Sequence, residues 1–117
     1  MTGVDPGQSG MVGYAIRNPE TGTITNQLSG LDHLDVGTWQ PMPTVWELNS
    51  DIPSVVISAE RYRSSGLTRA ILRGAPYEAA NTHAERVEAV RRFLAANERG
   101  VAYVYVPELD MAAHAHG

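Results

Sequence analysis

Two acidic residues stand at the ends of predicted strands, where side chains can do chemistry. Asp5 ends a short β-prone segment and Glu60 ends a longer apolar one, 55 positions later. In open α/β sheets, ligands collect at the carboxyl ends of strands, and two carboxylates brought together there repel each other unless a cation or a shared proton compensates. Oxygen ligands of this kind suit Mg²⁺ or Mn²⁺. In a second interpretation, Asp5 caps a turn and Glu60 pairs with Arg61 or Arg63 at the surface.

Positive charge is concentrated directly after Glu60. The chain has nine basic residues, all arginine, against thirteen acids, which gives a formal charge of −4. Residues 61–73 nevertheless contain no acid and four arginines, and arginine's planar fork suits contact with phosphate. The segment therefore predicts phosphate binding, unless it is a solvated loop that pairs with the acidic first half. The four residues are Arg61, Arg63, Arg69 and Arg73.

The first half of the chain reads as three short strands. Residues 2–5 are β-prone and end at the turn signal Asp5-Pro6-Gly7. Residues 11–16 form the next apolar stretch, and residues 23–28 alternate β-branched and polar side chains after a turn at residues 18–22. We therefore predict an antiparallel meander of three strands.

The second half predicts alternating helices and strands. Residues 45–48 suit one or two helical turns, and residues 54–60 are a short apolar run typical of a buried parallel strand. Apolar residues recur at helical spacing over 77–98, and residues 101–106 are strongly β-prone. A strand–helix–strand unit crosses over right-handedly and places its strands in parallel, so we expect an α/β fold with a mixed sheet.

Length and composition limit the remaining possibilities. The 117 residues are enough for one domain with its own core, which we predict for residues 1–117. The absence of cysteine excludes disulfides, thiolate nucleophiles and cysteine-based metal sites. The N-terminus has no leader pattern, and no apolar run is long enough to cross a membrane, so we expect a cytoplasmic protein without a membrane partner.

Four segments resemble a known family. They are similar to the RuvC-like Holliday junction resolvases, phage-type members in particular, of the RNase H-like superfamily. The resemblance implies a mixed five-stranded sheet, formed by a three-strand antiparallel meander plus two parallel strands, with flanking helices. The matching segments are Gly3-Val4-Asp5-Pro6-Gly7-Gln8-Ser9-Gly10 with the strand after it, Val55-Val56-Ile57-Ser58-Ala59-Glu60, the helix from Glu85 to Leu94, and Val104-Tyr105-Val106-Pro107.

The resemblance also implies a catalytic site with two Mg²⁺ or Mn²⁺ ions. Asp5 and Glu60 would be its first two metal ligands, and Asp110 would be a third on a terminal helix. His114 would stand one turn after Asp110 and act in catalysis, because residues four apart lie above one another on a helix. A histidine in a glycine-terminated tail could equally have no role.

The same resemblance implies that DNA lies beside Glu60. Tyr62 would stack on a splayed base at a junction, as aromatic side chains do on single-stranded substrates. The four arginines of residues 61–73 would hold the phosphates. The implied DNA-binding residues are Arg61, Tyr62, Arg63, Arg69 and Arg73.

Together these features predict a metal-dependent endonuclease that cleaves branched DNA as a homodimer. Two alternatives remain open. One is a YqgF-type RNA-processing nuclease, which shares the acid and glycines of the first motif. The other is a shortened, non-catalytic RNase H-like module that binds nucleic acid or a protein, since Pro107 lies only three residues before Asp110.

Overall fold

The computed structural model describes residues 1–117, which divide into two compact units. The first unit contains residues 1–50 and 61–74, and the second contains residues 51–60 and 75–117. No helix in either unit combines the length and the hydropathy needed to cross a membrane.

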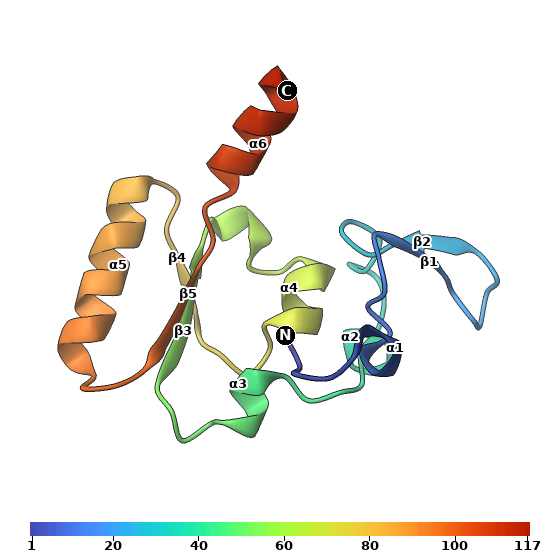
Figure 1. Ribbon diagram of the computed structural model, residues 1–117, viewed down its shortest axis with the longest axis horizontal. Helices are drawn as coiled ribbons and strands as arrows, with labels where there is room; N and C mark the ends of the chain where they lie inside the picture. Colours follow the sequence, from blue (N-terminus) through green and yellow to red (C-terminus); the bar gives the residue numbers. More distant parts are fainter. The chain divides into compact units, whose positions relative to one another are not determined.

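The first unit is built mainly from short helices (Figure 1). Its two-stranded sheet is an antiparallel hairpin in which Ile16 pairs with Thr25, and a buried Asn18 and a left-handed Gly22 form the turn. The predicted hairpin is therefore confirmed, as is the predicted short helix at residues 45–48. The elements are α1 (Pro6–Ser9), β1 (Ala15–Arg17), β2 (Ile24–Asn26), α2 (Val36–Trp39), α3 (Val45–Leu48) and α4 (Gly66–Ile71).

The predicted strand at residues 2–5 is wrong, and with it the three-strand meander. Gly3 adopts a left-handed conformation with φ of 72°, which interrupts an extended segment. Asp5 is instead the N-cap of α1, with proline at the first helical position and the Gln8 side chain accepting from the Asp5 N–H at 3.4 Å. The segment after Asp5 is thus a helical turn.

Buried polar side chains tie the first unit together around Leu31 and Trp46. Gln40 is fully buried and donates to the Ala70 carbonyl at 3.2 Å, and Thr44 is fully buried and donates to the Arg73 carbonyl at 2.6 Å. These bonds satisfy carbonyl groups at the C-terminal end of α4, where no further helical turn is present to do so.

Gly66 is expected to be the least replaceable glycine of this unit. A Cβ at this position would lie 2.2 Å from the Leu31 carbonyl carbon, and the Gly66 N–H already donates to Asp32 Oδ1 at 2.5 Å. Since backbone must move to admit a methyl group, Gly66→Ala should lower the free energy of unfolding by about 3 kcal/mol. Urea denaturation monitored by circular dichroism measures the change.

Gly7→Ala is the matched control for this variant. Gly7 also lies in a helix, but a Cβ there meets no atom within 4 Å. Stability should be unchanged or slightly raised, because alanine favours helix over glycine. Equal losses in the two variants would show that Gly66 is not in close contact with Leu31.

The stability of the first unit should depend on pH through Glu47. The Thr44 backbone N–H donates to the Glu47 carboxylate at 2.8 Å, and this bond is the main reason that the pKa of Glu47 lies below its usual value of 4.5. Arg73, whose Nε lies 3.1 Å from Glu47 Oε1, lowers the pKa further. The ionised form of Glu47 therefore stabilises the folded state. This contribution to the free energy of unfolding is complete above about pH 4.5 and is lost as the pH falls below that value.

Glu47→Gln should therefore flatten the pH dependence of stability below pH 4.5. Denaturant unfolding of wild type and variant at several pH values between 3 and 7 would show two curves that approach each other in acid. Parallel curves would contradict the contribution of Glu47.

The second unit contains a parallel sheet of three strands in the order β4–β3–β5 (Figure 1). Val56 pairs with Tyr77 on one side and with Tyr103 on the other, and both neighbours run parallel to β3. The predicted strands at residues 54–60 and 101–106 and their parallel pairing are therefore confirmed. The elements are β3 (Ser54–Ser58), η1 (Glu60–Tyr62, which continues into the first unit), β4 (Tyr77–Ala79), α5 (His83–Ala96), β5 (Val101–Val104) and α6 (Pro107–His116).

Helix α5 begins six residues later than predicted, because β4 occupies the start of the expected helix. Thr82 caps α5: its side chain accepts from the Glu85 N–H at 3.2 Å, and Glu85 accepts in turn from the Thr82 N–H at 3.0 Å. This reciprocal pair satisfies two helix N–H groups and fixes where the helix starts.

The core of the second unit lies between the sheet and α5 (Figure 1). Val55 and Ile57 from β3 pack with Ala80 and with Ala89 of α5, and Val90, Phe93 and Ala102 extend the cluster. Helix α6 then leaves the carboxyl end of the sheet directly after β5.

The predicted RNase H-like fold is wrong. The chain has a two-stranded antiparallel sheet in one unit and a three-stranded parallel sheet in the other, and no strand joins them into a five-stranded sheet. The physical reason is the conformation of residues 3–9, which turn into α1 and leave the hairpin without a third strand.

Candidate functional site at the carboxyl end of the parallel sheet

Polar side chains gather at the carboxyl ends of the three parallel strands. Glu60 follows β3, and its N–H donates to the Asn81 side chain, which follows β4, at 3.0 Å. The Tyr77 hydroxyl donates to the Ala59 carbonyl at 2.6 Å. Ser58 is buried at the last position of β3, and its hydroxyl has no hydrogen-bond partner. This is the edge at which open parallel sheets bind ligands.

Arg86 fixes the start of α6 to this edge. Its guanidinium is almost fully buried and bonds to both Glu108 oxygens, at 2.7 and 2.8 Å. It also donates to the carbonyls of Ala80 and Asn81, at 3.1 and 3.2 Å. The bonds from Arg86 lower the pKa of Glu108 to about 2, so this carboxylate is ionised at neutral pH. This bidentate contact between a buried guanidinium and a half-exposed carboxylate sets the direction in which α6 leaves the sheet.

Asp110 and His114 form a second pair further along α6. His114 Nε2 lies 3.5 Å from Asp110 Oδ1, and both side chains are mostly exposed. The terminal helix that the resemblance implied is present as α6, and it aligns these two residues at positions i and i+4. Between them they present one hard oxygen and one imidazole nitrogen to solvent.

His83 adds a further imidazole at the start of α5. Its Nε2 lies 3.7 Å from Glu108 Oε2, on the carboxylate that Arg86 already holds. His83 also lines an open groove of about 400 Å³ with Arg86, Val87, Val90, Val104 and Val106. The groove is mainly apolar and lies beside the charged edge.

The chain's own residues fit part of a metal centre. Two ligands that each lie about 2.1 Å from one divalent cation are themselves about 3 to 3.5 Å apart, which matches Asp110 and His114. No group of three or more histidine or acidic side chains is placed to hold a metal ion. The pair can therefore contribute two ligands, but it does not form a complete centre.

The structure places the other predicted ligands in different units. Asp5 lies in the first unit as the cap of α1, and Glu60 lies in the second at the end of β3. The interpretation of Asp5 as a cap at a turn therefore matches its local structure. The metal-binding role inferred for Asp5 and Glu60 stays a prediction.

The arginines expected to bind DNA have partners within the protein. Arg73 donates to Glu47, Ala70 and Met42, and Arg69 donates to the Asp32 carbonyl at 2.8 Å. Arg61 lies over the Tyr62 ring, 4.8 Å from its centre. DNA binding by residues 61–73, Arg63 included, stays a prediction, as does a homodimer.

Comparison with known families assigns the chain over its whole length. The model of the type I phosphodiesterase / nucleotide pyrophosphatase family matches residues 1–117. The chain belongs to this family. No curated protein and no solved structure matches the chain.

Membership in this phosphodiesterase family overturns the resemblance to the RuvC-like resolvases. The family belongs to the alkaline phosphatase superfamily, not to the RNase H-like one, and cleavage of Holliday junctions is not part of what the match supports. Hydrolysis of phosphodiester or pyrophosphate bonds fits the family, whose members typically use divalent metals. The family match thus supports the predicted phosphodiester hydrolase in general, but not the predicted DNA substrate.

Sequence reasoning missed Arg86, Glu108 and His83. Glu108 follows the end of β5 by four residues, whereas Glu60 follows the end of β3 by two, so the rule that selected Glu60 finds Glu108 only when it is extended to the residues after Pro107. Arg86 follows the capping box of α5 by one position, but its complete burial cannot be seen in a pattern that marks arginine as solvent-exposed.

Proposed function

We propose that this chain acts in the hydrolysis of phosphodiester or pyrophosphate bonds of nucleotides, and that Asp110 and His114 contribute two ligands to a divalent cation used in the reaction. The observation that carries the proposal is the 3.5 Å separation of these side chains on the exposed face of α6, in a chain whose full length matches the phosphodiesterase family.

The surroundings of the pair support this role. Asp110 follows Glu108 by two residues, and Glu108 is fixed by the bidentate contact with buried Arg86. Because the first turn of α6 is fixed, Asp110 and His114 keep their place relative to the carboxyl end of the sheet. Placement of ligands on a rigid, anchored element favours cation binding, since less order must be imposed when the ion binds.

A bound divalent cation would supply positive charge to a phosphoryl group and polarise it. Asp110 and His114 have the ligand types for this purpose, since a carboxylate oxygen and a neutral imidazole both bind Mn²⁺ and Zn²⁺. His114 would bind the cation through Nε2, the ring nitrogen that faces Asp110.

A substrate comparison tests the proposal. The protein is incubated with Mn²⁺, Zn²⁺ or Mg²⁺ and one of three substrates: a nitrophenyl ester of a nucleoside monophosphate, a dinucleoside diphosphate, or a four-way DNA junction. We expect cation-dependent release of nucleoside monophosphate from one or both of the first two. The absence of hydrolysis of either nucleotide with every cation would contradict the proposal.

A further inference from the structure

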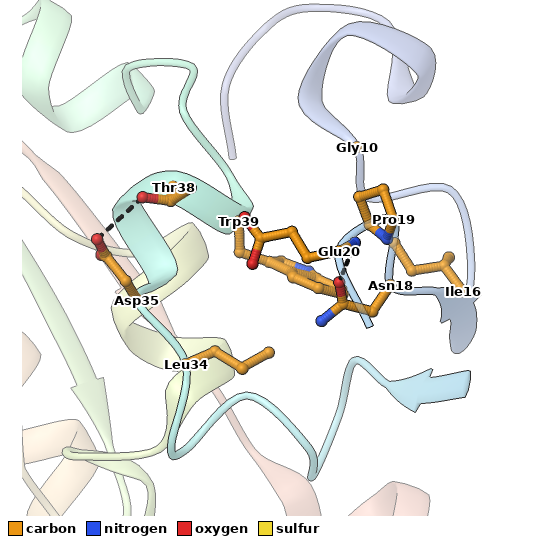
Figure 2. Close-up of a pocket in the computed structure, with 9 residues that line it drawn as sticks. All are labelled: Gly10, Ile16, Asn18, Pro19, Glu20, Leu34, Asp35, Thr38 and Trp39. Carbon is orange, nitrogen blue, oxygen red and sulfur yellow. Dashed lines mark hydrogen bonds between the residues drawn. The ribbon is translucent and has the colours of Figure 1, made fainter. Parts of the chain in front are cut away.

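A second candidate site lies in the first unit and includes none of the residues proposed to bind the cation. A pocket of about 390 Å³ opens between the β1–β2 hairpin and α2 (Figure 2). Ligand-binding pockets commonly have volumes of about 300 to 1,000 Å³. Its lining residues are Gly10, Ile16, Asn18, Pro19, Glu20, Leu34, Asp35, Thr38 and Trp39.

The indole of Trp39 is held in place at this pocket. Its Nε1–H donates to Gln27 Oε1 at 3.0 Å, and Gln27 in turn donates from Nε2 to the Gly13 carbonyl at 2.6 Å. Gln27 is almost completely buried, so its amide cannot readily reorient. The ring is thus fixed before any ligand arrives, which reduces the entropy lost when a flat ligand stacks on it.

Asn18 supplies an unused hydrogen-bond donor. Its side chain is more than nine-tenths buried, and Oδ1 accepts from the N–H groups of Glu20 and Thr21, at 2.9 and 3.3 Å. These two bonds identify Oδ1 as the acceptor and leave Nδ2 as the donor. Nδ2 has no partner in the protein, and Figure 2 shows it pointing away from the bond to Glu20 and into the pocket.

The remaining polar groups of the pocket are acceptors. The Glu20 carboxylate is exposed and makes no hydrogen bond or ion pair within the protein, and it lines the pocket together with Trp39. Asp35 accepts from Thr38 and from the Gly37 N–H, which lower its pKa and keep it charged at neutral pH. No arginine or histidine lines the pocket. A phosphate group would therefore be repelled here.

We propose that this pocket binds the nucleobase of a nucleotide, with a preference for bases that carry an exocyclic amino group. The base would stack on Trp39 and donate its amino protons to Glu20, while Asn18 Nδ2 would donate to a ring nitrogen. Adenine has the amino group and the acceptor nitrogen side by side, which matches this donor and acceptor order. The proposal rests on the proposed function only for the choice of nucleotides as the ligand class.

A simple organic cation is the competing ligand chemistry, because an indole flanked by carboxylates also attracts ammonium groups. The Asn18 donor distinguishes the two. A quaternary ammonium accepts no hydrogen bond, so it would leave Nδ2 unpaired, whereas a nucleobase satisfies it.

Calorimetric titration of the protein with adenosine tests the proposal without any phosphate or metal. We expect a dissociation constant of about 0.1 mM, the affinity typical of a ligand of this size. Uridine, which has no amino group, should bind at least about tenfold more weakly. Tetramethylammonium, which has no hydrogen-bond acceptor, is the probe for the competing chemistry.

Two conservative variants test the contacts. Asn18→Asp keeps the acceptor that holds the turn and removes the donor, and Glu20→Gln keeps the shape and removes the charge. Each should weaken adenosine binding about tenfold, the effect of one lost hydrogen bond in the site. Glu98→Gln, which changes an exposed glutamate outside the pocket, is the control and should bind as wild type does.

Three outcomes would overturn the proposal: no binding of adenosine at millimolar concentration, equal binding of uridine, or tighter binding of tetramethylammonium. Unchanged affinity in both variants would also overturn it. The result is independent of the hydrolysis assay, because adenosine contains no bond that a phosphodiesterase cleaves. A protein that binds adenosine but hydrolyses no nucleotide would contradict the proposed function alone.

Discussion

Asp110→Asn is expected to reduce cation-dependent hydrolysis of a nucleotide phosphodiester by about 100-fold or more, since a neutral amide replaces the charged ligand of the cation. Asp110 is exposed and its contact is the 3.5 Å approach to His114. The substitution should therefore leave the fold intact. Steady-state kinetics at several cation concentrations measure the effect, and raising the cation concentration should recover part of the lost rate.

His114→Ala should show the same pattern, and His116→Ala provides the matched control. His116 lies two residues further along α6 at an exposed position and has no acidic partner. The His116→Ala variant should therefore hydrolyse substrate as wild type does. If Asp110→Asn retained full activity at low cation concentration, the assignment of the cation to this pair would be wrong.

Arg86→Met should be the most destabilising substitution of a charged residue in the second unit. The side chain is 2% exposed and bonds to two backbone carbonyls as well as to Glu108. Methionine fills much of the same volume but leaves those carbonyls without their donor. Hydrogen bonds from charged donors contribute about 1.5 to 3 kcal/mol each, so we expect a loss of about 3 kcal/mol in the free energy of unfolding.

The same variant should also release the start of α6. Amide hydrogen exchange at residues 108–112 should become faster than in wild type, and hydrolysis should fall even under conditions in which the sheet remains folded. Arg91→Met is the control, because Arg91 is exposed and pairs only with Glu88 on its own helix. A pair of this kind contributes little, so its loss should be close to neutral. Equal effects of the two substitutions would contradict the anchoring role of Arg86.

The second unit could be predicted largely from sequence because its signals are local. The apolar run of β3, the β-prone run of β5 and the helical spacing of α5 each lie within one segment, and the crossover rule then makes the strands parallel. Strand β4 was missed because it has only three residues, all half-buried, directly before a helical pattern. The capping box of Thr82 and Glu85 was the available sign that the helix starts later.

The first unit could not be predicted in the same way. Its short helices are fixed by capping side chains, by glycines at close contacts and by buried polar bonds such as those of Gln40 and Thr44. The buried bonds of Gln40 and Thr44 join residues about 30 positions apart in the sequence, which no local pattern reveals. The spacing of Asp110 and His114 was informative because a helix alone determines whether residues four apart meet. The family resemblance failed because it assumed an extended strand where Gly3 and the cap at Asp5 produce a turn.

The most direct test of the central claim is electron spin-echo spectroscopy of Mn²⁺ bound to the protein, since it detects nitrogen atoms bonded to the ion. We expect modulation from one imidazole nitrogen in wild type and in His116→Ala. That modulation should be lost in His114→Ala, and the Mn²⁺ affinity should fall in Asp110→Asn. A bound ion without nitrogen modulation, or modulation that persists in His114→Ala, would contradict the claim that Asp110 and His114 hold the cation.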